Sequence, residues 1–427
     1  MSAVRAADKR IYNRPIKFVS LAGGREIGRH SHYLSIGKLK ILVDPGVQAN
    51  GHARPIDVKD LHGLNFIFLT HAHLDHIGSL IDVMLVNPHT RVCATRATRA
   101  LASIILKKSN LTRGRYSEEE IDRCINRIKT VHCEEEIHMG KGIYARFIDA
   151  GHILGSASIV ICAPEGNIMI TGDFATEDRG VLFPFRRPDM DLRALITEGS
   201  LVGLSMPSAA RERDSFMSHL RGNINEDRNV VVAATPLGVF QEYAMLMPQL
   251  QQDGLLPSFP IFLNANLREA FKIYLRYYES LALAAKLPKE SFAGFMVLEP
   301  LDKKVDVSKM SPFCLIAGPS NLKWEFPNGF VRQVIMQGGY LIADNRYTES
   351  LIYRRVSRRG KDRIKPEQIM RMCSSNHVTE PDLNSLIDEM RPHKTVFVHG
   401  MPRSLRRFAR ELSGVAMVSR IKEFINL

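Results

Sequence analysis

Residues 71–76, "HAHLDH", place three histidines and an aspartate directly after the apolar run "IFLT". Side chains at i and i+2 of an extended segment point the same way, so His71 and His73 can share one metal ion. Once the strand breaks into a turn, Asp75 and His76 can face a second ion. Imidazole and carboxylate donors together suit zinc, with manganese or iron as lesser options. A merely polar loop mouth is the weaker interpretation, because such clusters are rarely incidental.

Two metal ions need more donors than this motif supplies, and four further polar residues share one local context. Each ends an apolar run: Asp44 ends "LKILVD", His152 ends "ARFIDAGH", Asp173 ends "NIMITGD" and His399 ends "TVFVH". Taken alone, a histidine or aspartate at a strand end is more often a turn or cap residue than a metal ligand. If these strand ends converge on one rim, however, the four residues complete a dinuclear metal site.

The elements that must position these residues follow from periodicity and turn signals. The first two hundred residues alternate short β-rich runs with Gly, Pro or polar clusters, and helices are expected at 98–110 and 117–129. Ser117 and Glu120 form a plausible capping box for the second helix. From about residue 205 the pattern becomes strand, helix, strand, which is typical of a parallel α/β unit. Long helices are expected there at 239–252 and 267–286.

Length and composition favour a folded protein that resides in a reducing compartment of the cell. At 427 residues, 45% apolar and 24% charged, the chain suits two domains or one domain with an insertion. Its six cysteines contain no CxxC pair, which favours reduced thiols in the cytoplasm. No apolar run is long enough for a membrane span, and the N-terminus lacks the apolar core of a secretory signal. A net charge of +13 favours a polyanionic partner, although charge alone also fits a basic soluble protein.

With these motifs in place, the chain resembles the β-CASP nucleases of the metallo-β-lactamase superfamily, which include ribonuclease J and the pre-mRNA cleavage endonuclease. The resemblance runs from about residue 15 to the end. Beside "HAHLDH" it is carried by "GGREIG", "ILVDPG", "DAGHILGSAS", "TGDF", "ITEGS", "SSNH" and "VFVHG", in that order.

The resemblance implies an αββα sandwich with an inserted α/β domain. Residues 1–204 and 367–427 would form the metallo-β-lactamase domain, and residues 205–366 would form the inserted β-CASP domain. The insertion would cover the metals, with the basic segment 353–366 as a candidate wall of a nucleic-acid cleft. A solvated basic loop explains that segment equally well.

The resemblance also implies a role for each motif residue. His71, His73 and His152 would hold one zinc, and Asp75, His76 and His399 the second, with Asp173 bridging both. Asp44 would orient the ligands. His377 would act as general acid or contact the phosphate, positioned by Glu198. An ordinary ion pair is the alternative for these last two residues.

The implied function is that of a zinc-dependent ribonuclease using two Zn²⁺ per chain, with Mn²⁺ as an alternative metal. Its partner would be single-stranded RNA, without a membrane, and a homodimer or a larger RNA-processing assembly is left open. Endonuclease and 5′-exonuclease action also stay open. His399 favours RNA, because the DNA-repair branch of the family lacks a histidine at that motif. A hydrolase of DNA or of small esters and thioesters, a partner-dependent subunit and a non-catalytic scaffold are the alternatives.

Three departures from the family pattern concern the substrate path rather than the metals. "LGVFQE" has Val239 where relatives have arginine, and the final motif reads "HGM", with Met401 in place of glutamate. "IAGPSNL" replaces a glycine-rich stretch of many relatives. We therefore expect metal chemistry to be retained, with a different 5′-end pocket or oligomer interface.

Overall fold

The protein, seen in a computed structural model, consists of two compact units. The structure describes residues 14–48, 56–58, 61–109, 114–233, 235, 237–293, 296–298, 312–317, 330–344, 365–373, 375–412 and 416–427. The first unit comprises residues 1–176, 184–205 and 377–427, and the second comprises residues 177–183 and 206–376. Both termini therefore belong to the first unit, and the second unit is inserted into it.

The first unit contains two seven-stranded sheets. The first sheet has the order β20 (Ile425–Asn426), β1 (Ile16–Ala22), β2 (Ser31–Ile36), β3 (Leu39–Val43), β4 (Phe66–Phe68), β5 (Arg91–Thr95) and β6 (Ile128–Val131). The second sheet has the order β19 (Ala416–Val418), β18 (Thr395–Val398), β11 (Leu192–Glu198), β10 (Asn167–Ile170), β9 (Ala157–Cys162), β8 (Ile143–Asp149) and β7 (Ile137–Gly140).

The main hydrophobic core lies between the two sheets. Phe18, Phe68 and Phe147 are among its fully buried side chains, and they come from β1, β4 and β8. Every residue of β9 is buried, because both faces of its sheet are covered. A second apolar cluster joins the outer face of this sheet to two C-terminal helices, for example through Phe397 and Phe408.

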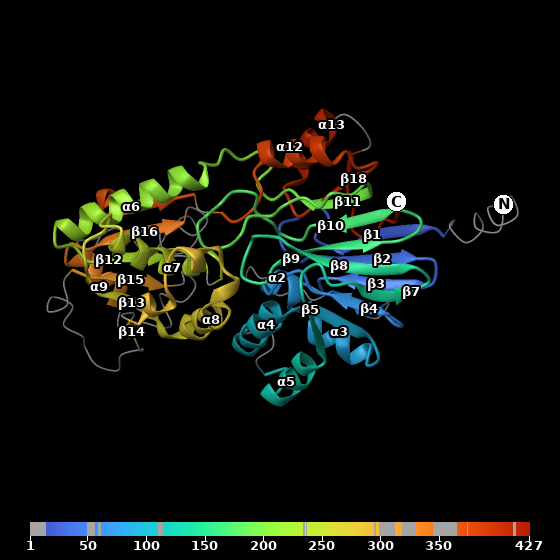
Figure 1. The fold of residues 1–427 in the computed structure, drawn as a ribbon, viewed down its shortest axis with the longest axis horizontal. Helices are drawn as coiled ribbons and strands as arrows, with labels where there is room; N and C mark the ends of the chain where they lie inside the picture. Colours follow the sequence, from blue (N-terminus) through green and yellow to red (C-terminus); the bar gives the residue numbers. More distant parts are fainter. Residues whose placement is uncertain are drawn as a thin grey trace, which may run out of the picture. The chain divides into compact units, whose positions relative to one another are not determined.

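Helices cover both outer faces of the paired sheets (Figure 1). On one side lie α2 (Leu74–Ile77), α3 (Leu80–Val86), α4 (Arg96–Lys108) and α5 (Glu118–Asn126), and on the other lie α12 (Glu380–Met390) and α13 (Pro402–Glu411). The expected αββα sandwich is therefore confirmed. The capping box of α5 is also confirmed, since Glu120 N–H donates to Ser117 Oγ while Ser117 N–H donates to the Glu120 carboxylate.

Strand direction brings the chemically interesting residues to one end of the sandwich. In the first sheet β3 is parallel to β4 and antiparallel to β2, so the start of β2 lies beside the ends of the other two strands. In the second sheet β10, β11 and β18 are parallel, and β8 points the same way because both β8 and β10 are antiparallel to β9. The residues that follow these strands therefore emerge at a common edge in each sheet.

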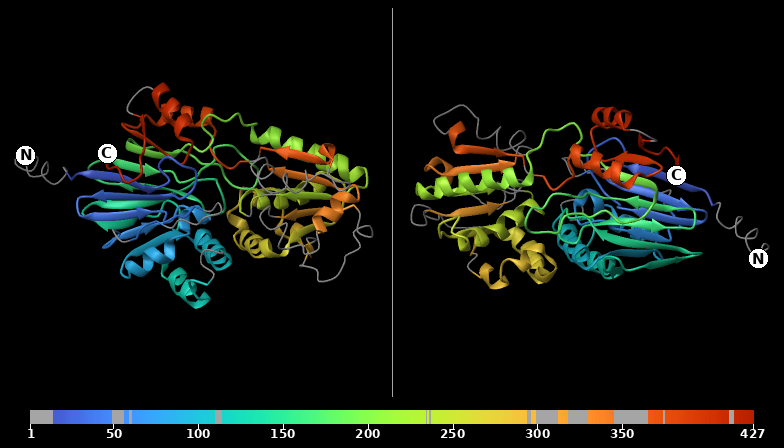
Figure 2. Two further views of the ribbon diagram at one scale, coloured as in Figure 1. Left: turned by 180° about the vertical axis from the view of Figure 1, so that it is seen from behind. Right: turned by 45° about the horizontal axis from the view of Figure 1, so that its top comes forward.

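The second unit is built on a six-stranded sheet whose described strand pairs are all parallel. Its order is β14 (Met296–Leu298), β13 (Ile261–Asn264), β15 (Cys314–Ala317), β12 (Val230–Ala233), β16 (Tyr340–Asp344) and β17 (Ile369–Met372). The helices that connect the strands are α6 (Ala209–Asn225), α7 (Val239–Gln252), α8 (Ala265–Arg276) and α9 (Phe330–Met336), with short 3-10 turns at η1 (Tyr278–Ser280), η2 (Ala282–Ala285), η3 (Lys289–Phe292) and η7 (Pro366–Gln368). Figure 2 shows α6 running along this sheet. The expectation of a parallel α/β unit agrees with this sheet.

Two boundaries differ from the sequence-based expectation. The helix expected at 267–286 ends at Arg276, and 3-10 turns follow it. Buried Tyr278 donates a hydrogen bond to the carbonyl of Leu287, which holds that segment in a compact turn. The second unit extends to residue 376 rather than 366, because β17 pairs with β16 as an edge strand.

Two further expectations concern segments and membranes. Residues 353–364, the greater part of the basic segment, lie outside the described residues, as do residues 318–322 of "IAGPSNL". In the part of the chain that the structure describes, no helix has both the length and the apolar character needed to cross a bilayer.

Candidate metal centre

The candidate metal centre lies at the common edge of the two sheets of the first unit. Asp44 follows β3, the "HAHLDH" motif follows β4, and His152, Asp173 and His399 follow β8, β10 and β18. Asp44 and His399 have φ values of 57° and 47°. These left-handed conformations turn the chain sharply, so that the side chain can point into the site as soon as the strand ends.

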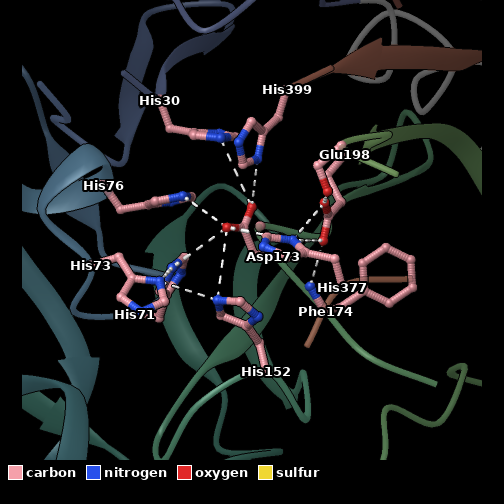
Figure 3. A network of polar contacts seen from close by, with 12 residues as sticks. His30, His71, His73, His76, His152, Asp173, Phe174, Glu198, His377 and His399 are labelled. Atoms are coloured by element: carbon pink, nitrogen blue, oxygen red, sulfur yellow. Dashed lines mark hydrogen bonds and ion pairs between the residues drawn. The ribbon is translucent and has the colours of Figure 1, made fainter. Parts of the chain in front are cut away.

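One group of donors is formed by His71, His73, His152 and Asp173, whose ligand atoms all lie within 4.8 Å of one another. His73 Nδ1 is 3.0 Å from His71 Nε2 and 3.1 Å from His152 Nε2. The same two Nε2 atoms lie 3.7 and 3.8 Å from Asp173 Oδ2. The sequence analysis grouped these four residues, and the structure brings them together (Figure 3).

A second group of donors is formed by His30, His76, His399 and the same Asp173. His399 Nδ1 lies 2.9 Å and His30 Nε2 lies 3.8 Å from Asp173 Oδ1, while His76 Nε2 lies 3.3 Å from Oδ2. The Asp173 carboxylate therefore stands between the two histidine groups, in the position of a bridge.

Asp75 differs from its expected place in this second group. It belongs to none of the three donor groups found among the described residues, and its side chain is partly exposed. A Cβ atom built on Gly28 would lie 3.6 Å from Asp75 Oδ2, so this carboxylate lies beside the 23–28 segment. The cause is local: Asp75 and His76 are adjacent in α2, so their side chains point in different directions and only His76 faces the interior.

The environment of the site shifts the pKa values of its buried groups in different directions. Burial, together with repulsion from His76, lowers the pKa of His71 well below its usual value. Burial opposes ionisation of Asp173 as well, yet His399 and His76 hold the pKa of this carboxyl well below its usual range. Burial likewise disfavours a charged His76, but Asp173 and Asp44 raise its pKa well above the ordinary value. Binding of a cation to His76 must therefore displace a proton.

Asp44 is not a member of either histidine group but fixes the rings that are. Its Oδ2 accepts hydrogen bonds from His76 Nδ1 at 2.8 Å and from Thr70 Oγ1 at 2.6 Å, while Thr70 N–H donates to Oδ1 at 2.8 Å. Because the Thr70 hydroxyl donates its proton to Asp44, its oxygen accepts a hydrogen bond from His71 Nδ1–H, 3.0 Å away. Both rings thus have Nδ1 engaged and direct Nε2 at the site, as metal-binding histidines require.

Glu198 and His377 form a separate pair beside Asp173. His377 Nδ1 lies 2.9 Å from Glu198 Oε2 and 3.8 Å from Asp173 Oδ2. Glu198 is fully buried and also accepts hydrogen bonds from Ser200 Oγ and from the backbone N–H of Phe174. These contacts hold the carboxylate in place, and the carboxylate holds the histidine ring.

The donor set fits a metal ion better than it fits a hydrogen-bonded network. In the first group, His73 Nδ1 lies 3.0 and 3.1 Å from two other ring nitrogens, although a neutral ring has only one N–H to donate. In the second group, the Nε2 atoms of His30 and His76 are buried and have no hydrogen-bond partner among the described residues. Ligand atoms around a tetrahedral zinc with bonds of about 2.0–2.1 Å stand about 3.3 Å apart, close to the separations seen here.

Sequence reasoning missed two members of this arrangement, His30 and Thr70. His30 immediately precedes β2 and does not follow a strand, so the strand-end signal did not include it. Thr70 carries no ionisable group, and only its hydrogen bonds to Asp44 reveal its place. The spacing of "HSH" at 30–32, again i and i+2, is the one signal that pointed to this segment.

Comparison with known proteins places this site in a family. The metallo-beta-lactamase superfamily profile matches residues 26–202, and the profile of the Zn-dependent metallo-hydrolase RNA specificity domain matches residues 363–421. Together the two profiles cover most of the residues that form the two sheets of the first unit. The chain belongs to the β-CASP family of metallo-β-lactamase-fold nucleases.

Two relatives illustrate the range of this β-CASP family. The chain is 27% identical over 342 residues to "Endoribonuclease ysh1" of Schizosaccharomyces pombe, covering 75% of this chain and 44% of that protein. It is 26% identical over 260 residues to "RNase J-like protein" of Methanocaldococcus jannaschii, covering 60% of each. This β-CASP chain thus spans about half the length of the relatives it matches.

A solved structure shares the fold over nearly the whole β-CASP chain. It is the crystal structure of a protein of unknown function from Enterococcus faecalis V583, with a TM-score of 0.61 and 16% sequence identity. The match covers 97% of this chain and 100% of the other. The likeness therefore extends to the inserted second unit as well as to the sandwich.

Proposed function

We propose that this β-CASP chain is a zinc-dependent ribonuclease that hydrolyses phosphodiester bonds of single-stranded RNA with two metal ions. The observation that carries the proposal is the Asp173 carboxylate, which faces one histidine group on each side and the His377–Glu198 pair beside them. Two cation sites that share a carboxylate are the arrangement that phosphodiester hydrolysis uses. The names of the relatives, an endoribonuclease and an RNase J-like protein, support RNA processing or decay as the setting.

The ligand sets follow from the geometry. His71, His73 and His152 would hold one ion, His76 and His399 would contribute to the other, and Asp173 would bridge them. Bound zinc supplies Lewis-acid chemistry, lowering the pKa of water and neutralising charge on a phosphate. Asp44 keeps the rings of His71 and His76 in the tautomer that leaves a lone pair facing the site.

His377 is placed to deliver a proton to the leaving 3′-oxygen. Glu198 accepts the Nδ1–H of the ring, so Nε2 is the ring atom through which His377 would act on a substrate. A buried carboxylate at Nδ1 also balances the charge of the doubly protonated ring that a general acid needs. His377 is slightly exposed, with 13% of its side-chain surface accessible, whereas Glu198 is sealed from solvent. We assign the proton transfer to His377 and the positioning to Glu198.

RNA is favoured over DNA and small esters by three features. The profile that matches residues 363–421 is that of an RNA specificity domain, and His399 lies within it. The net charge of +13 suits a polyanion. The chain also carries an inserted unit and a Glu198–His377 pair, which hydrolysis of a small ester does not require. The six cysteines are free thiols, which supports a cytoplasmic setting.

The proposal is tested by cleavage of one end-labelled single-stranded RNA and of its DNA equivalent. Zinc-reconstituted wild type, Asp173→Asn and Asp191→Asn are compared, since Asp191 is an exposed aspartate of the same unit. We expect RNA-selective cleavage by wild type and Asp191→Asn and none by Asp173→Asn. The product ladder separates endonuclease from 5′-exonuclease action. Full activity in Asp173→Asn, or a preference for DNA, would overturn the proposal.

A further inference from the structure

His30 is held rigidly against the metal-binding turn by its own backbone. Its N–H donates to the carbonyl of Asp75 at 2.7 Å, and its carbonyl accepts from Gly46 N–H at 2.6 Å. A Cβ atom at Gly46 would lie 1.6 Å from the Asp75 carbonyl oxygen, so only glycine permits the three segments to approach this closely. These backbone hydrogen bonds tie the position of His30 to the "HAHLDH" turn.

The ring of His30 completes a cage of imidazoles around one side of Asp173. It stacks on His76, with centroids 3.9 Å apart and planes inclined by 18°, and meets His399 edge-on at 4.0 Å. Its Nε2 lies 3.8 Å from Asp173 Oδ1. The residue is 1% exposed, and among the described residues this nitrogen has no hydrogen-bond partner. A buried, unpaired polar atom is costly unless something satisfies it, and an ion bound by His76, His399 and Asp173 would do so.

The opposite nitrogen of His30 is engaged in a buried relay. His30 Nδ1 lies 3.3 Å from His32 Nε2, His32 Nδ1 lies 3.2 Å from Ser20 Oγ, and Ser419 Oγ donates to Ser20 Oγ at 2.8 Å. His32, Ser20 and Ser419 are all buried. The Ser20 hydroxyl oxygen can accept two hydrogen bonds, here from Ser419 and from His32. In one consistent pattern, His32 Nδ1–H donates to Ser20 Oγ and His30 Nδ1–H donates to His32 Nε2. That pattern leaves the Nε2 lone pair of His30 directed at Asp173.

We propose that His30 is a ligand of the second metal ion, together with His76, His399 and Asp173, and that the His32–Ser20–Ser419 relay positions it. The inference rests on the metal centre of the proposed function and is independent of the RNA substrate. A site with three imidazoles and one carboxylate oxygen is richer in nitrogen than a site that uses Asp75. Such a donor set favours zinc over manganese or magnesium at this position.

Metal binding provides the test without reference to activity. Metal-free wild type, His30→Asn, His32→Asn and the surface control His138→Asn are titrated with Zn²⁺ in competition with a chromophoric chelator. His138 suits the control because 79% of its side-chain surface is exposed. We expect His30→Asn to weaken the second ion at least about tenfold, and His32→Asn by about tenfold, while the first ion stays unchanged. Binding of the second ion to His30→Asn with wild-type affinity would overturn the proposal.

A spectroscopic experiment on the wild type covers the case in which a variant fails to fold. Long-range ¹H–¹⁵N correlation spectra of histidine-labelled protein show which nitrogen of each ring carries a proton and which shifts on adding Zn²⁺. We expect His30 Nδ1 to be protonated and Nε2 to shift with the second equivalent. A protonated Nε2 in the zinc-loaded protein would exclude His30 as a ligand.

The outcomes also separate this inference from the proposed function. If the protein binds two ions, the second of which depends on His30, but leaves RNA intact, the ligand assignment would be supported and the ribonuclease proposal removed. RNA cleavage by a His30→Asn variant that retains both ions at wild-type affinity would do the reverse.

Discussion

At the scale of single residues, the site is organised by three buried carboxylates that hold its histidines. Asp173 faces both histidine groups, Asp44 sets the tautomers of His71 and His76, and Glu198 holds His377. Ionised carboxylates are the natural hubs of such a network, because each has about four lone-pair sites and donates nothing. Loss of one hub should therefore affect several ligands at once, whereas loss of His377 should affect one step alone.

The His377→Ala variant separates proton transfer from metal binding. We expect RNA cleavage to slow by about 10²- to 10⁴-fold, the usual contribution of a general acid, with zinc content unchanged. Cleavage rates and zinc-to-protein ratios are measured on the same samples, and His393→Ala, at an exposed histidine, is the control. Zinc lost along with activity would instead place His377 among the metal ligands.

The buried histidines should make the metal-free protein sensitive to acid. Burial lowers the pKa of His32 to about 3 and, despite nearby carboxylates, that of His73 to about 4. In the unfolded chain both titrate near pH 6.5, so below that pH the unfolded state binds more protons and the free energy of unfolding falls. The opposite shift of His76 adds no slope well below pH 6.5, since that ring is then protonated in both states.

Urea denaturation of the metal-free protein from pH 7 to pH 4.5 measures this effect. We expect stability to decrease steadily below about pH 6.5, and His32→Phe, which removes one titrating ring, to flatten the decrease. Stability that is constant over this range would contradict the assignment of neutral, buried rings.

At the scale of elements, much of the site was predictable because parallel strands end at the same edge. The strand-end pattern of the sequence predicts Asp44, His152, Asp173 and His399 as site residues, and the structure places all four at one end of the sandwich. His30 escaped the same reasoning, because it lies immediately before β2, a strand that runs antiparallel to β3. The start of such a strand lies at the same edge as the ends of its neighbours, and this can be known only when the pairing is known.

Element ends were harder to predict than element types. The helix α7 spans the expected residues 239–252, whereas α8 ends ten residues early at Arg276. Nothing in the local sequence forbids a longer helix there. The buried side chain of Tyr278 and its hydrogen bond to Leu287 decide the matter, and both depend on packing within the second unit.

A glycine at the end of β10 shows how closely the elements must approach. Gly172 has a φ of 59°, and a Cβ there would lie 2.7 Å from Thr70 Cβ. Gly172→Ala should therefore disturb Thr70, and through it Asp44 and His71. Gly140 is a matched control, since its φ is 88° and an added Cβ would meet nothing within 4 Å.

We expect both glycine variants to lose about 1–2 kcal/mol from the left-handed backbone. Gly172→Ala should lose a further 1–3 kcal/mol or so from overpacking, and it should also bind zinc more weakly. Chemical denaturation and zinc titration are the measurements. Equal stability and equal zinc affinity in the two variants would contradict the role given to the Thr70 contact.

At the scale of the whole molecule, the metal chemistry belongs to one of the two units. All members of the described donor groups lie in residues 1–176, 184–205 and 377–427. Seven separate stretches of chain supply them, at residues 30, 71–76, 152, 173, 198, 377 and 399. An ion that bridges several of these stretches should therefore stabilise the folded unit by mass action. Binding at a thousandfold excess over the dissociation constant contributes about 4 kcal/mol.

Removal of metal should consequently loosen the first unit and leave the second unchanged. We expect a chelator to increase hydrogen exchange in peptides around residues 70–76, 150–156 and 171–174, with no change in α6 or β12. Mass spectrometry resolves these peptides, and restoring zinc should restore their protection. Increased exchange spread evenly over both units would argue against a metal centre confined to the sandwich.

The central claim is that two metal ions are bound on either side of Asp173. Anomalous diffraction from crystals of the zinc-loaded protein, recorded at energies above and below the zinc absorption edge, locates bound zinc directly. We expect two peaks per chain, one among His71, His73 and His152 and one beside His76 and His399, with the Asp173 carboxylate between them. A single peak, or zinc bound away from Asp173, would contradict it.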